Sequence, residues 1–217
     1  MNTATLRLWQ LISPALPVGA YSYSQGLEYV NLRGIVRDEY TALQWLRELL
    51  SHALATLDLP ILLRVHRAWS ARDGLAVRRL SRMLEARRET SELRFEDLAM
   101  GSALTQLLDS LGQPIPERRL PFASAFAVAC VDWSVPEADA CAGYAWAWCE
   151  GQVAAAVKLV PLGHTAGQRM LLALGNEIGA AVTSAAARRD DEIGLGLPGF
   201  AIASALHETQ YTRLFRS

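Results

Sequence analysis

The sequence predicts an all-α protein, and three observations support this prediction. Apolar residues recur with the 3.6-residue spacing of helices along almost the whole chain. Runs in which β-branched and polar residues alternate, as half-buried strands require, are missing. Of the 217 residues, 51% are hydrophobic and 20% are charged, which is enough apolar surface to bury a core without disulfides or metals. We therefore expect a single domain of about nine or ten helices.

The first half of the chain should contain six helices, separated by proline, glycine and capping residues. A helix over 3–12 should end before Pro14, because the residue ahead of a proline avoids the helical region. A second helix should begin near Ser22, where Ser22 and Gln25 have capping-box spacing, and a third after Asp38. The next three are expected to run from Asp58 to a stop at Gly74, over 75–87 and over 90–111.

The second half should be organised around one apolar helix. Pro114 and Pro116 mark the expected internal linker, and a helix over 121–132 follows it. The helix that begins at Pro136 and ends before Pro161 is apolar on nearly every face, so we expect the other helices to wrap around it. Two further helices are expected, from Thr165 to Arg188 and near 200–208. They complete a domain of residues 1–208, and residues 209–217 form a C-terminal extension.

Composition and charge exclude several classes of partner and location. The formal net charge is −1 and the charges are interspersed, which argues against a surface for nucleic acid or acidic lipid. The three cysteines lie in apolar stretches without Cys-x-x-Cys spacing, so we expect buried reduced thiols. The N-terminus has no basic segment followed by a sustained apolar run, and charges interrupt the longer apolar stretches. We expect a soluble cytoplasmic protein that does not enter a membrane.

The common catalytic motifs are missing from the sequence. The chain has one lysine, Lys158, and no phosphate-binding Gly-x-x-x-x-Gly-Lys loop, so it should not hydrolyse nucleotides by itself. The segment 19–23 lacks the closing glycine of a serine-hydrolase elbow. His207-Glu208 begins like a zinc-protease helix, but Tyr211 stands where the second histidine is required. We therefore expect no enzyme activity, no cofactor and no metal site.

The remaining histidines and the adjacent carboxylates have ordinary interpretations. Single, scattered histidines are more often packed or surface residues than metal ligands, which applies to His52, His66 and His164. Glu96 and Asp97 lie on an amphipathic helix, and we expect them on its solvated face.

Three segments contain residues that a helical core does not require. They are 11–28, which includes SPALPVGAYSYSQGLE; 157–169, VKLVPLGHTAGQR; and 207–217, HETQYTRLFRS. Together with 89–94 and Met100-Gly101, they resemble the UreF family of urease accessory proteins, and the similarity extends in order over essentially the whole chain. One departure is His164, where the family pattern has glutamine, and it leaves open whether this histidine adds local metal affinity.

The resemblance implies a function in metal-centre assembly. It implies a non-catalytic, dimer-forming, cytoplasmic protein that joins UreD (UreH in some organisms) to the GTPase UreG and helps to insert nickel into apo-urease. Two alternatives remain. The protein could be a metallochaperone that binds nickel itself through His207 or His164 with a carboxylate. It could instead activate UreG directly, with Lys158 or an arginine entering the GTPase site.

The same segments supply the candidate partner-binding residues. The tail is rich in residue types found in interface cores, and we expect it to be mobile in the free protein and to order on UreD, with Leu214 and Phe215 filling pockets. Lys158 is a candidate UreG contact, and the stretch from Ser22 to Glu28 is either a capped helix start or a docking surface. The full candidate set is Ser22, Tyr23, Ser24, Gln25, Glu28, Lys158, His207, Glu208, Tyr211, Arg213, Leu214, Phe215 and Arg216.

Overall fold

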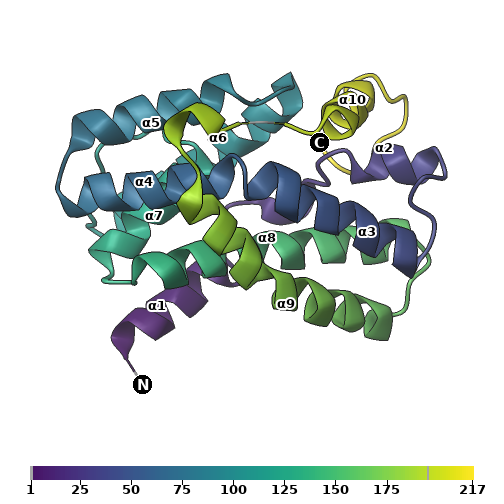
Figure 1. Ribbon diagram of the computed structural model, residues 1–217, viewed down its shortest axis with the longest axis horizontal. Coiled ribbons are helices and arrows are strands. Elements are labelled where there is room, and N and C mark those ends of the chain that lie inside the picture. The colour runs from purple at the N-terminus through teal and green to yellow at the C-terminus, as the bar shows by residue number, and fades with distance from the viewer. Residues whose placement is uncertain (1, 195) are drawn as a thin grey trace.

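The computed structural model describes residues 2–194 and 196–217, and within them it contains ten α-helices and no strand (Figure 1). The all-α prediction is therefore confirmed. The helices are α1 (Thr3–Ile12), α2 (Leu27–Leu32), α3 (Glu39–Leu49), α4 (Asp58–Ser70), α5 (Gly74–Ala86), α6 (Ser91–Ser110), α7 (Phe122–Asp132), α8 (Glu137–Leu159), α9 (His164–Ala187) and α10 (Pro198–His207). Short turns at Ala20–Ser22 and Asp190–Glu192 are 3₁₀-helical, and Leu50–Leu54 continues α3 as a π-helix.

Two helices form the centre of the core. α8 contacts α1, α2, α3, α4, α7 and α9, which confirms the predicted central helix. α7 lies between α4 and α6, and eight consecutive residues from Ala123 to Cys130 are buried. All three cysteines are free and buried, and burial raises the pKa of Cys149 to about 12. These thiols are therefore protonated at neutral pH and act as small apolar side chains.

A glycine allows α6 to approach the start of α7. A Cβ atom added at Gly101 would lie 1.9 Å from the carbonyl oxygen of Leu120 and 2.8 Å from the nitrogen of Phe122. These are backbone atoms, which cannot move aside as the end of a long side chain can. Gly101 is thus required by close backbone contact between two core elements.

Two helix boundaries differ from the sequence predictions, and one agrees. Ser22 belongs to the 3₁₀ turn, and α2 begins only at Leu27 because Gly26 first passes through a left-handed conformation with φ 76°. α4 ends at Ser70, and Gly74 is the first residue of α5 rather than a stop signal. Asp38 makes the expected N-cap of α3, where its side chain accepts a hydrogen bond from the backbone of Thr41.

A buried ion cluster joins four helices near the middle of the fold. Arg88, just after α5, donates to Asp58 of α4 at 3.1 Å and to Asp97 of α6 at 2.8 Å. The hydroxyl of Tyr144 on α8 donates to Asp58 at 3.1 Å. The prediction that Asp97 faces solvent is wrong, because this carboxylate is buried and its charge is compensated by Arg88.

Among the described residues, only α9 is long and apolar enough to cross a membrane by length and composition. Core helices pass the same test, and α9 packs against α8, α3 and α4.

Candidate functional site

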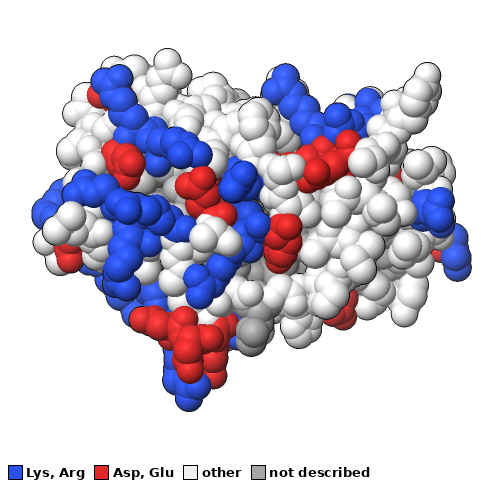
Figure 2. All heavy atoms as spheres, turned by 90° about the horizontal axis from the view of Figure 1, so that it is seen from above, with Lys and Arg blue, Asp and Glu red and all other residues white. Residues whose placement is uncertain are grey.

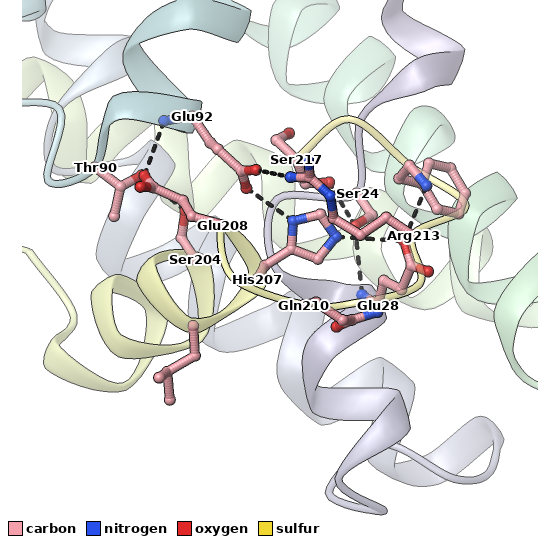
Figure 3. A network of polar contacts seen from close by, with 12 residues as sticks. Ser24, Glu28, Thr90, Glu92, Ser204, His207, Glu208, Gln210, Arg213 and Ser217 are labelled. Carbon is pink, nitrogen blue, oxygen red and sulfur yellow. Dashed lines mark hydrogen bonds and ion pairs between the residues drawn. The ribbon is translucent and has the colours of Figure 1, made fainter.

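The C-terminal tail folds back onto the loop between α1 and α2 and onto α6 (Figures 1 and 3). The backbone N–H and the hydroxyl of Ser24 both donate to the main-chain oxygen of Ser217, at 2.7 and 2.6 Å. The backbone N–H of Arg216 donates to the carbonyl oxygen of Ser22 at 2.8 Å. We call this contact region, formed by 22–28, the first turns of α6 and 207–217, the tail site.

Glu28 holds the main chain of the tail. Its buried carboxylate accepts hydrogen bonds from the backbone N–H groups of Leu214 at 2.7 Å and of Phe215 at 2.9 Å. The same carboxylate lies 3.3 Å from Nε2 of His207, at the end of α10. A carboxylate in this position binds the tail through backbone atoms, so the contact does not depend on the identity of the tail side chains.

His207 bridges two carboxylates. It is fully buried, with Nδ1 2.7 Å from Glu92 on α6 and Nε2 facing Glu28 (Figure 3). Both ring nitrogens therefore lie within hydrogen-bond distance of a glutamate carboxylate. Arg213 pairs with Glu92 as well. His207 and Arg213 thus both contact Glu92, and both ring nitrogens of His207 are engaged by carboxylates.

Glu96 anchors the end of the tail. It accepts hydrogen bonds from the hydroxyl of Ser217 at 2.6 Å and from the side chain of Gln25 at 2.7 Å, and Gln25 accepts one from Trp148. Burial raises the pKa of Glu96 to about 7, despite the hydrogen bonds that favour its charged form. The prediction that Glu96 faces solvent is wrong, because the tail and α8 cover it. Burial, followed by the charge of Glu96, also raises the pKa of Tyr23.

The tail has one buried aromatic ring and two exposed large hydrophobic side chains. The ring of Phe215 is buried, and the ammonium of Lys158, near the end of α8, lies 4.9 Å from its centroid. Tyr211 is fully exposed and Leu214 is 56% exposed. Glu208 caps α6 by accepting hydrogen bonds from the hydroxyl of Ser91 and the backbone of Glu92. Tyr211 and Leu214 are thus exposed to solvent on a segment that is held before them by the contacts of Glu208 and after them by the buried Phe215.

A cavity of about 420 Å³ lies beside the tail site, between the loop and α8. Leu11, Tyr23, Trp148 and Phe215 contribute to its mostly apolar wall. The side-chain oxygen of Gln152, also in this wall, is buried and has no hydrogen-bond partner among residues 2–194 and 196–217.

The structure brings the candidate residues together at the tail site. Their spatial proximity could not be read from a chain in which Glu28 and Phe215 are 187 positions apart. The expectation that Phe215 fills a pocket on a partner differs from the structure, where this ring packs against its own chain. The tail is folded onto the body in the structure, and its mobility in the free protein stays a prediction.

Sequence reasoning missed Glu92, Glu96 and Trp148 as members of this site. The available signal was the spacing of Glu92 and Glu96, one helical turn apart, next to the family-like segment 89–94. The division into a domain of residues 1–208 and a partner-docking tail remains a prediction.

Metal ligation has little basis in the described part of the chain. No group of three or more histidine, cysteine or acidic side chains there is arranged to hold a metal ion. His164 is exposed at the first residue of α9 and lies apart from the tail site.

Comparison with known proteins places the chain in a family. The fold and site define an all-helical protein whose C-terminal tail docks onto buried carboxylates of its own body. The UreF family model matches residues 36–175. A urease accessory protein UreF from Alkalilimnicola ehrlichii is 50% identical, covering 99% of this chain and 96% of its own length, and one from Teredinibacter turnerae is 47% identical over the full length of both. The chain belongs to the UreF family of urease accessory proteins.

Proposed function

We propose that this chain is a non-catalytic scaffold and regulator of urease maturation. In this proposal it forms a cytoplasmic homodimer, binds UreD through the tail site and positions UreG, and so assists nickel insertion into apo-urease. The observation that carries the proposal is the tail itself. Buried carboxylates fix its backbone, while Tyr211 and Leu214 remain exposed. Tyrosine and apolar side chains on a fixed backbone bind a partner at low entropic cost.

Lys158 is the proposed UreG contact. Its ammonium lies against the ring of Phe215, and its own side chain remains accessible at the end of α8. A UreG molecule bound there would touch the same surface that holds the tail. This proximity supports a scaffold in which the two partners occupy neighbouring sites.

Co-expression with both partners tests the scaffold. We expect the chain, UreD and UreG to elute together from a size-exclusion column, and UreD and UreG to elute separately when the chain is omitted. A stable UreD–UreG complex without the chain would refute the bridging role.

A fixed-time GTPase assay separates scaffolding from direct activation of UreG. Scaffolding predicts that the chain leaves the turnover of UreG unchanged or lowers it. An arginine or lysine finger would instead raise turnover by roughly 10³-fold or more. A large increase that is lost in Lys158→Ala would replace the scaffold proposal with the activator alternative.

The nickel-binding alternative is not favoured, because both nitrogens of His207 are engaged by carboxylates. Isothermal titration of the isolated chain with nickel tests it. Submicromolar binding that is lost in His207→Ala would restore this alternative.

A further inference from the structure

The outer face of α5 carries arginines that the fold does not use. α5 packs inward through Val77, Leu80 and Leu84. Arg79 and Arg82 therefore point away from the core, and both are exposed. Neither has an ion-pair or hydrogen-bond partner among the described residues. Arg78, beside them, makes only a 3.5 Å contact with the carbonyl oxygen of Pro116.

Charge is concentrated around this helix. Residues 60–94 contain nine arginines and four acidic residues, a formal charge of +5 in a chain whose total is −1. Viewed from above, Figure 2 shows the basic side chains gathered mainly over the half of the molecule that carries α5 in Figure 1. Several of these arginines are paired with carboxylates from other parts of the chain, as Arg64 is with Asp190 and Arg72 with Asp132. Arg79 and Arg82 have no such carboxylate among the described residues, so their charge is left uncompensated at the surface.

Two acidic residues near these arginines make contacts elsewhere. Glu85, on α5 itself, pairs with Arg119 at 3.0 Å. Asp73 caps the start of α5 through the backbone of Ala76. Neither of these two carboxylates is paired with Arg79 or Arg82.

We propose that Arg78, Arg79 and Arg82 form a docking surface for an acidic patch on a protein partner. Guanidinium groups bind carboxylates in bidentate geometry, and exposed pairs of this kind mainly accelerate association. Leu75, 74% exposed one turn earlier, adds an apolar contact. Nucleic acid fits less well, because this face of α5 offers no exposed aromatic ring for stacking and the chain as a whole is not basic.

This inference rests on the proposed function, because UreD, UreG and apo-urease are the partners to be tested. The key variant is Arg79→Glu/Arg82→Glu. Its control is Arg37→Glu/Arg189→Glu, which makes the same change in net charge at two side chains that are 72% and 71% exposed on other elements. Association rates with each immobilised partner are measured at about 50 mM and about 500 mM salt.

The proposal expects one partner whose association with the unmodified chain slows at high salt. For this partner, Arg79→Glu/Arg82→Glu should lower the low-salt association rate by roughly tenfold and flatten its salt dependence, whereas the control should stay within about twofold. Circular dichroism should confirm that both variants fold.

Three results would overturn the inference. The first is equal association of both variants with every partner. The second is an effect confined to binding of a single-stranded RNA probe, which would assign the surface to nucleic acid. The third is that the unmodified chain binds none of the three proteins, which would overturn the proposed function together with this surface. If the unmodified chain binds its partners and Arg79→Glu/Arg82→Glu binds them equally fast, only the surface proposal is overturned.

Discussion

Replacing Glu28 with alanine should release the tail while the helical body stays folded. The carboxylate accepts two backbone hydrogen bonds from the tail, at 2.7 and 2.9 Å, and faces His207. A hydrogen bond to a charged group is worth about 1.5 kcal/mol at the low end, so the two backbone bonds together hold the tail by about 3 kcal/mol. Since 1.4 kcal/mol is a factor of ten, the population of the detached tail should rise roughly a hundredfold.

Hydrogen exchange of the tail amides measures this population directly. In Glu28→Ala, the amides of Leu214 and Phe215 should exchange roughly a hundredfold faster than in the unmodified chain, while the amides of α7 keep their protection. Local release leaves the core intact, so global stability should change less than tail protection does.

Glu48→Ala is the matched control, because Glu48 is exposed on α3 and its one ion pair, with His52, is 3.7 Å long. Tail exchange in this variant should equal that of the unmodified chain. If Glu28→Ala changes tail exchange by less than about threefold, the carboxylate does not hold the tail and the reasoning from hydrogen-bond energies fails.

Three further variants test the core and the site. Gly101→Ala should lower the free energy of unfolding by about 1–3 kcal/mol in thermal denaturation, because its methyl group meets backbone, whereas Gly151→Ala on α8, with open space, should not. Arg88→Ala should cost about 3–5 kcal/mol in urea unfolding, because Asp58 and Asp97 are left buried without a counter-charge; Arg82→Ala should change little. The folded pKa of Glu96 lies above its ordinary value, so its contribution to stability is complete below about pH 4.5 and is lost as the pH rises through about 7. Between pH 5 and pH 8 the free energy of unfolding of the unmodified chain should fall by on the order of 2–3 kcal/mol from this group, and Glu96→Gln should remove that fall. If the unmodified chain has the same free energy of unfolding at both pH values, the prediction is wrong.

Local sequence signals predicted elements that depend on local chemistry. The N-cap at Asp38 and the central apolar helix α8 are examples, because capping residues and apolar periodicity act within one helix. Gly74 was misassigned because glycine can end one helix or begin the next. The start of α2 was misplaced because a left-handed Gly26, which packs against α10, overrides the capping-box spacing at Ser22.

Long-range contacts explain what the sequence could not reveal at the site. Glu96 lies three residues after Leu93 and four before Met100 on the buried face of α6, and the groups that bond its carboxylate, Gln25 and Ser217, are 71 and 121 positions away. The residue types of the tail indicated contact with a partner, which stays a prediction. They could not indicate that the ring of Phe215 would be buried against its own chain while Tyr211 and Leu214 remain exposed.

The affinity of the chain for UreD tests the central claim most directly. Tyr211→Ala/Leu214→Ala removes the two exposed large hydrophobic side chains of the tail, and Tyr40→Ala/Leu172→Ala removes a comparable exposed pair from α3 and α9. The account predicts that the tail variant weakens UreD binding by at least about tenfold, while the control binds as the unmodified chain does. Equal affinity of all three proteins would contradict the account, because UreD would then bind a surface other than the tail.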